Sequence, residues 1–193
     1  WAKNGEASGT EGYAYRLEAI EIKLVQKGKA APGSTSNVFV KKPTQVIYST
    51  HVQNIGWQNA KTNGEIAGTT GQSLRLEGIN VNLSNLEFSG GITYQTHVQN
   101  IGWQGWKSNG QMAGTEGKSL RLEAIRIKLT GEISNYYDVY YRVHSQEFGW
   151  LGWAKNGEAS GTEGYAYRLE AIEIKLVQKG KAAPGSTSNV FVK

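Results

Sequence analysis

The stretch VIYSTHVQNIGW at residues 46–57 opens a pattern that returns as ITYQTHVQNIGW at 92–103 and as VYYRVHSQEFGW at 139–150. Each copy continues to AGTTG, AGTEG or SGTEG and closes with SLRLEGINVNL, SLRLEAIRIKL or AYRLEAIEIKL. His51, His97 and His144 are therefore 46 and 47 residues apart. Self-similarity at a fixed period of this size indicates a repeat architecture, whose single units seldom bury their own apolar face. We predict that three units close around one core.

The residues within each unit alternate as they do in β-strands. Residues 46–53 have an apolar face, which includes Tyr48 and Val52, and a polar face, which includes His51 and Gln53. Asn-Gly pairs at 63–64, 109–110 and 156–157 predict type I′ hairpin turns, because both central residues of that turn need a positive φ. Nothing in the chain has a helical period.

The closing segments predict β-bulges, because their alternation slips by one residue. The slip occurs at Glu77–Gly78 and again at 123–124, 170–171 and 18–19, and one extra residue there restores the apolar face. We therefore expect an all-β domain of three pseudo-threefold repeats of about 46 residues. A β-prism-like arrangement is favoured, with a β-trefoil as the alternative, because the long closing segment suits a flat prism face.

A second, longer repeat contains the first, since residues 1–41 recur letter for letter as residues 153–193. The chain is thus one 152-residue period of a tandem array plus the overlap into the next. QKGKAAPGSTSN, at 26–37 and 178–189, has the Gly, Ala, Pro and Ser content of a linker. The expected organisation is a closing half of a preceding repeat unit at 1–28, a linker at 29–45, a three-repeat β domain at 46–178, and a linker to the next domain at 179–193.

The composition and motifs of the chain argue against several classes of function. Seven lysines lie in two segments without Asp or Glu, residues 26–45 and 178–193, and without them the +5 net charge becomes slightly negative, so no basic stripe for nucleic acid is expected on the repeats. No apolar run approaches the length of a membrane span, and there is no cysteine for a thiol nucleophile or a Cys zinc site. Asp138 is the only Asp, and no nucleophile elbow, P-loop or zinc-protease motif occurs. We expect no enzyme activity and no cofactor.

The GW pair followed by a second Trp, the NG turn, AGTxG and RLEAIxIKL together resemble the clostridial hydrophobic repeat with its signature Trp. The resemblance covers all three units and the N-terminal half unit. It implies an extracellular module, found in strings on surface proteins of Gram-positive bacteria, that binds polysaccharide or protein partners without catalysis. One departure is Ala60, which replaces the second Trp of the first unit.

The tryptophans divide into two sets, three residues apart. The first set follows Gly in every complete unit and is expected in the core, in a structural role: Trp57, Trp103 and Trp150. The second set tolerates Ala60 and is expected nearer the surface, where Trp106 and Trp153 offer sugar-stacking platforms or, equally, packing against a neighbouring domain. The polar partners expected for a sugar are Gln53, Gln99 and Gln146.

Each unit also repeats an Arg and a Glu two residues apart at the predicted bulge. We interpret Glu77, Glu123 and Glu170 as structural, each paired with its Arg and accepting bulge N–H groups, with a grip on sugar hydroxyls as the alternative. Three histidines on a threefold axis could hold Zn²⁺, but shared ancestry explains their recurrence, so no metal site is expected.

Two functions remain after these exclusions. The first is a structural building block of a cell-surface array or filament, which identical tandem copies favour. The second is a carbohydrate-binding module, which exposed Trp favours.

Residues 1–28 have a closing strand at 15–24 but no opening strand, so we expect this segment to self-associate head to tail with another chain or an adjoining domain.

Overall fold

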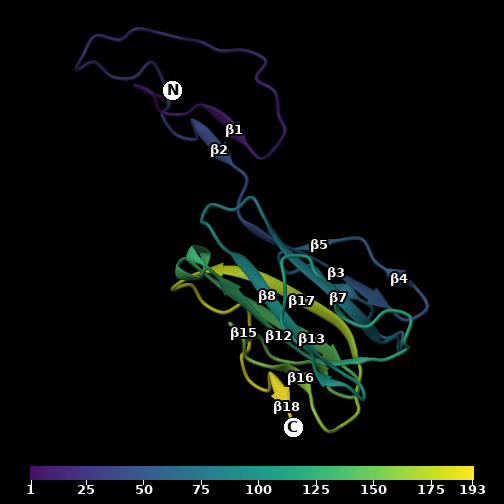
Figure 1. The fold of residues 1–193 in the computed structure, drawn as a ribbon. Coiled ribbons are helices and arrows are strands. Elements are labelled where there is room, and N and C mark those ends of the chain that lie inside the picture. Colours follow the sequence, from purple (N-terminus) through teal and green to yellow (C-terminus); the bar gives the residue numbers. More distant parts are fainter. The chain divides into compact units, whose positions relative to one another are not determined.

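The computed structural model describes all residues from Trp1 to Lys193 and is all-β. It divides into an N-terminal segment, residues 1–43, and a domain, residues 44–193 (Figure 1). The one helical turn, η1 (Glu132–Asn135), has four residues. No helix with the length and hydropathy of a membrane span is present.

Within the domain, each repeat contributes one long opening strand, three short strands and one long closing strand. We refer to residues 46–89 as the first repeat, 92–135 as the middle repeat and 139–182 as the third repeat. The first repeat holds β3 (Gln45–Val52), β4 (Gly56–Trp57), β5 (Lys61–Thr62), β6 (Ala67–Gly68) and β7 (Leu76–Ser84). The middle repeat holds β8 (Gly91–Val98), β9 (Gly102–Trp103), β10 (Lys107–Ser108), β11 (Ala113–Gly114) and β12 (Leu122–Thr130). The third holds β13 (Tyr137–Ser145), β14 (Gly149–Trp150), β15 (Ala154–Lys155), β16 (Ser160–Thr162) and β17 (Leu169–Gln178).

The opening and closing strands of each repeat pair antiparallel, and the predicted bulges lie in the three closing strands of the domain. On β7, Leu76 is opposite Val52 and Gly78 is opposite His51, so Glu77 is the extra residue. The same shift leaves Glu123 and Glu170 as the extra residues of β12 and β17. The Asn-Gly turns also form as expected, since both residues of each pair have positive φ.

The sheets are built across repeats. β11 of the middle repeat pairs with β7 of the first, and β16 of the third repeat pairs with β12 of the middle one. β6 of the first repeat pairs with β17 of the third, so the exchange of short strands closes on itself. The result is three sheets in which every closing strand lies between its own opening strand and a short strand from another repeat.

Glycine in the AGT motif is required by this exchange. A Cβ on Gly114 would lie 2.4 Å from the carbonyl oxygen of Glu77, and the same contact would be 2.3 Å at Gly68 and 2.4 Å at Gly161. All three residues also have a φ above 100°, a region that other residues rarely adopt. The short strand therefore approaches the bulge of the neighbouring repeat closely enough that only glycine fits.

Buried tyrosines add a second link between repeats. The hydroxyl of Tyr48 donates to the carbonyl of Glu65 in its own repeat and accepts a hydrogen bond from the backbone N–H of Ile174 in the third repeat, at 3.1 Å. Tyr94 does the same with Val81 of the first repeat. Burial raises the pKa of Tyr48 to about 12, so it stays a neutral donor.

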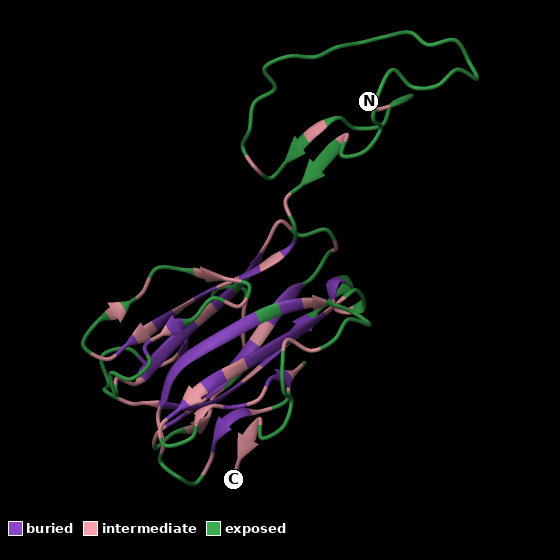
Figure 2. Cartoon of the chain, turned by 180° about the vertical axis from the view of Figure 1, so that it is seen from behind, coloured by how far each residue is buried: buried purple, intermediate pink, exposed green.

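The core is one cluster formed by the inward faces of all six long strands, which Figure 2 shows as buried bands running through the domain. Its largest fully buried side chains include Tyr48, Tyr94 and Tyr141, one from each opening strand. The three tyrosines occupy the same position of their repeats. On β3, burial alternates from residue to residue, and Tyr48 is on the buried face.

Residues 183–193, which lie within the predicted linker, pack on the domain; we call them the strap. Its strand β18 (Phe191–Val192) pairs in parallel with β16, as Figure 1 shows. Val190 and Val192 pack against the core cluster. The linker interpretation rested on the Gly, Ala, Pro and Ser content and did not include this packing.

The N-terminal segment contains the same strap arrangement, because residues 29–41 repeat residues 181–193. β1 (Gly9–Glu11) pairs in parallel with β2 (Phe39–Lys41), just as β16 pairs with β18. The closing strand expected at 15–24 does not form here, and neither does a bulge at 18–19, because no opening strand pairs with these residues. The exposed fractions of Leu17, Ile20, Ile22 and Leu24 run from 70% to 99%.

Candidate functional site

The strap is held on the third repeat by backbone hydrogen bonds. Trp153 N–H donates to the carbonyl of Ser186 at 2.8 Å, and Gly161 N–H donates to the carbonyl of Val190 at 3.1 Å. Gly152 leaves room for this contact, because a Cβ there would lie 2.1 Å from the carbonyl oxygen of Ser188. The strap thereby satisfies donors that would otherwise face solvent at a sheet edge.

The third repeat, on which the strap docks, differs from the other two at a residue that caps the short strand. In the first and middle repeats, the side-chain amides of Gln58 and Gln104 cap the short strands, each bonding both the N–H and the carbonyl of Gly68 or Gly114. The third repeat has Leu151 at this position, so its short strand has no such cap and pairs with the strap. Leu151 itself is buried. The sequence contained this signal, Leu in place of Gln, and it was missed.

A groove of about 700 Å³ lies between the strap and the third repeat. Its walls are Phe148, Trp150 and Trp153 on the repeat side and Pro184, Ser186 and Asn189 on the strap side. Arg142 is also part of the wall, with its guanidinium carbon 4.8 Å from the ring centre of Trp150 and 4.9 Å from that of Trp153. Glu173 pairs with the Arg142 guanidinium at 2.5 Å. The groove thus combines aromatic faces with hydroxyl, amide and carbonyl groups. The positive charge of Arg142 in its wall is neutralised by Glu173.

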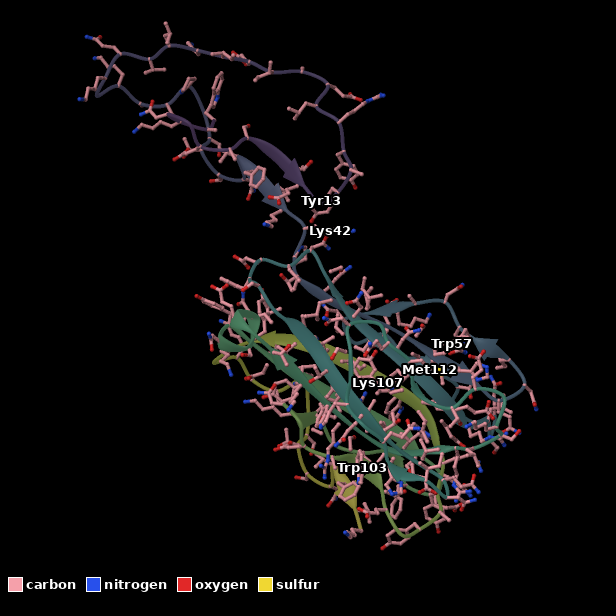
Figure 3. The ribbon with its side chains drawn as sticks, in the orientation of Figure 1. Tyr13, Lys42, Trp57, Trp103, Lys107 and Met112 are labelled. Atoms are coloured by element: carbon pink, nitrogen blue, oxygen red, sulfur yellow. The ribbon has the colours of Figure 1, made fainter.

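The first tryptophan set does not lie where the sequence predicted. Trp57 is 37% exposed and Trp103 and Trp150 are half-buried, so the expectation that this set forms the core is wrong. Each of these indoles instead packs edge-on against the His of its own repeat, with ring centres 5.5 Å apart. In Figure 3, Trp57 and Trp103 are on separate parts of the domain surface.

The second tryptophan set divides between two environments. Trp106 is 42% exposed, as expected for a surface residue, but Trp153 is only 6% exposed because the strap covers it. A Cβ on Gly185 would lie 3.1 Å from the indole nitrogen of Trp153, and Gly33 stands in the same relation to Trp1, at 3.0 Å. The interpretation of Trp153 as an open sugar platform is therefore wrong in this structure.

The histidines and glutamates form three separate clusters. His51 Nδ1 lies 3.2 Å from Glu77 Oε2, while Arg75 binds Glu77 Oε1 through its Nε and a terminal nitrogen at 2.9 and 2.7 Å. The same arrangement recurs at His97 with Glu123 and at His144 with Glu170. The Arg–Glu pairs form as predicted. The second carboxylate oxygen faces the His Nδ1, which makes no hydrogen bond, and not the bulge N–H groups. No group of three or more His, Asp or Glu side chains is placed to hold a metal ion.

The three glutamines predicted as sugar ligands lie beside the same bulges. The side-chain oxygens of Gln53 and Gln99 are 3.5 Å from the backbone N–H groups of Arg75 and Arg121, and Gln146 accepts a hydrogen bond from the Arg168 guanidinium at 2.8 Å. Their hydrogen-bonding capacity is partly used inside the repeat. None of the three lines the groove.

The fold and these sites define a tandem-repeat, all-β module. The chain matches the family model described as Clostridial hydrophobic W in four stretches, residues 1–26, 51–85, 97–131 and 144–178. These stretches cover more than half of the chain, and it belongs to this family. No curated protein and no solved structure is significantly similar to it.

Proposed function

We propose that this chain is a non-catalytic extracellular module that serves as a structural building block of a cell-surface array or filament. The observation that carries the proposal is the strap. The segment between two successive domains is docked on the domain before it, at Trp153, and the identical segment adopts the same pairing beside Trp1. Each building block therefore consists of one domain together with the strap that leads to the next domain.

The docked strap makes the joint between blocks short. In the N-terminal segment, β2 ends at Lys41, and the next domain begins at Thr44. Only Lys42 and Pro43 remain between them, and proline restricts its own φ and the residue before it. A joint of two residues gives blocks a regular spacing, which a flexible Gly/Ser tether of 15 residues would not.

Electron microscopy of a surface that displays the array tests this function. We expect particles of one size at a regular spacing along each filament of the array. Irregular distances between neighbouring particles, as expected for domains joined by flexible linkers, would contradict the proposal.

Within this proposal, the domain is arranged as a β-prism, with an approximate threefold axis relating its repeats. The closed exchange of short strands between repeats and the three equivalent bulges support this arrangement. Superposition of residues 46–89, 92–135 and 139–182 tests it, and backbones that fail to overlay would favour another architecture.

We also propose that residues 1–28 mediate self-association. Their exposed apolar side chains gain burial on contact with a second copy, which favours association. A second copy offers no free opening strand, because β3, β8 and β13 already pair with β7, β12 and β17. Association therefore proceeds by addition of this segment to an exposed edge, or by completion of the unit from a preceding domain.

The groove of the third repeat favours a second candidate function, binding of carbohydrate. Aromatic walls at Phe148 and Trp150, together with polar groups from the strap, are the elements of a sugar site. A glycan array with the intact chain tests this candidate. We expect Trp150→Ala to lower glycan retention and Trp57→Ala, its counterpart in the first repeat, to leave it unchanged. Equal loss in both variants would exclude the groove.

A further inference from the structure

The outward face of the middle repeat carries two tryptophans and two cations in contact. The Arg126 guanidinium carbon lies 4.5 Å from the ring centre of Trp103, and Lys128 Nζ lies 4.4 Å from that of Trp106. Arg126 and Lys128 are two residues apart on β12, so both point away from the core, while Ile125, Ile127 and Leu129 point into it. The four side chains form one exposed surface, which we call the middle-repeat face.

Neither cation on this face has an acidic partner. No carboxylate lies within ion-pair distance of Arg126 or Lys128, and the buried Nε of Arg126 has no hydrogen-bond acceptor. The residue across the strand pair from Arg126 is Gln95, which is uncharged. The middle-repeat face therefore presents positive charge without an acidic partner beside the partly exposed indole of Trp106.

The other two repeats lack this combination at the same positions. In the first repeat, Ala60, Asn80 and Asn82 replace Trp106, Arg126 and Lys128. In the third repeat, Glu173 stands in place of Arg126 and neutralises Arg142, and the strap covers Trp153. Nothing covers the middle repeat in this way, since a Cβ on Gly105, the counterpart of Gly152, would meet no atom within 4 Å.

The chemistry of the face identifies its ligand. Indole surface stacks on the apolar side of a pyranose ring, and guanidinium and ammonium groups pair with an anion. A chain of uronic acids supplies both, because each residue combines a ring face with a carboxylate. A polyol phosphate has the charge without a ring, and a neutral glycan has the ring without the charge.

We propose that the middle-repeat face binds an acidic polysaccharide of the polyuronate class, with Trp106 stacking on a sugar ring and Arg126 and Lys128 pairing with its carboxylates. This site is separate from the groove of the third repeat. It stands whether or not the chain assembles into an array, because it needs only one domain.

Titration of the full chain with a hexamer of galacturonic acid, followed by calorimetry and tryptophan fluorescence, tests the proposal. We expect saturable binding that weakens as salt is added, because the cations contribute through charge. Trp106→Ala, and separately the double change Arg126→Asn with Lys128→Asn, should each weaken binding about tenfold or more. These changes install the residues of the first repeat, so they suit this fold. Lys128→Asn alone should also weaken binding, whereas Lys175→Asn, which removes the same single charge at the matching position of the third repeat, should leave the affinity unchanged.

Three outcomes would overturn the inference. The first is binding of a neutral hexose hexamer, or of a polyglycerol phosphate, as tightly as the uronate. The second is an affinity that falls as much with Lys175→Asn as with Lys128→Asn, which would show attraction by net charge alone. The third is loss of uronate binding with Trp150→Ala but not with Trp106→Ala, which would assign the ligand to the groove. If the chain is not a structural building block, electron microscopy of the array would show irregular spacing, and the results of these titrations would not change.

Discussion

At the scale of single residues, one tryptophan position has different roles in three copies of one sequence pattern. Trp153 is covered by the strap, Trp106 is open beside Lys128, and the first repeat has Ala60. The surroundings decide the difference, because Leu151 admits the strap where Gln104 caps the strand. The same position is therefore buried in one repeat and exposed in another, although the strands around it are equivalent.

This difference predicts unequal effects of the same substitution. Trp153→Ala removes a buried indole and should lower the free energy of unfolding by about 3 kcal/mol or more. Trp106→Ala removes a half-exposed one and should change it by no more than about 1 kcal/mol. Urea denaturation of the two variants measures both values. Equal losses would mean that the strap does not bury Trp153.

The single aspartate predicts a pH dependence. Burial by itself raises the pKa of Asp138, but hydrogen bonds from Lys179, Asn156 and Lys155 outweigh it and lower the pKa to about 2. A lowered pKa stabilises the fold while the carboxylate is charged, and the stabilisation is lost as the pH falls from about 4 to about 2. Asp138→Asn should thus be less stable than the parent chain by about 2 kcal/mol at pH 7.

Thermal unfolding of both proteins across this pH range measures the difference. It should shrink steadily below pH 4. A difference that stays constant down to pH 2 would show that the charge of Asp138 does not stabilise the domain.

At the scale of elements, much of the β organisation could be predicted, because it depends on local chemistry. Alternation gave the opening strands, Asn-Gly gave the turns, and the slip at Glu77 gave the bulge. The pairing of β11 with β7 could not be predicted, because a two-residue strand has no periodicity and its partner lies in another repeat. The position of His51 could not be predicted for a similar reason, since its Nδ1 lies 3.2 Å from Glu77, which belongs to the opposite strand.

The candidate sites were less predictable than the strands. The recurrence of Trp57, Trp103 and Trp150 predicts a core position, but recurrence does not separate burial from a repeated contact with His. The composition of residues 178–189 predicts a linker, although the apolar VFV at 190–192 takes part in the pairing with β16. The groove depends on both of these features, so only its two tryptophans, Trp150 and Trp153, could be named from sequence.

The glycine of the AGT motif gives a test at this scale. Gly114→Ala should destabilise the domain by about 3 kcal/mol or more, because the new Cβ meets the Glu77 carbonyl and the φ of +105° is unfavourable for alanine. Gly105→Ala is the control, since its Cβ meets no atom within 4 Å, and it should change stability by less than about 0.5 kcal/mol. Similar unfolding midpoints for the two variants would mean that β11 does not pack on the bulge.

At the scale of the whole molecule, the N-terminal segment predicts association. Sedimentation velocity of the chain should show larger species as its concentration rises, because contact buries Leu17, Ile20, Ile22 and Leu24. Changing Ile20 and Ile22 to Lys should abolish these species without altering the domain, which carries its own copies at Ile172 and Ile174. A chain that stays monomeric at all concentrations would remove residues 1–28 from the proposed contacts.

Docking of the strap on the third repeat makes it part of the block, and hydrogen exchange of the intact chain measures this docking. The amides of Gly161 and Glu163 donate to the strap carbonyls of Val190 and Val192. Both amides should exchange as slowly as those of β17, and Leu151→Gln, which restores the cap of the other repeats, should free the strap while β17 stays protected. Exchange of these amides at the rate of an unfolded chain in the unaltered protein would contradict the account.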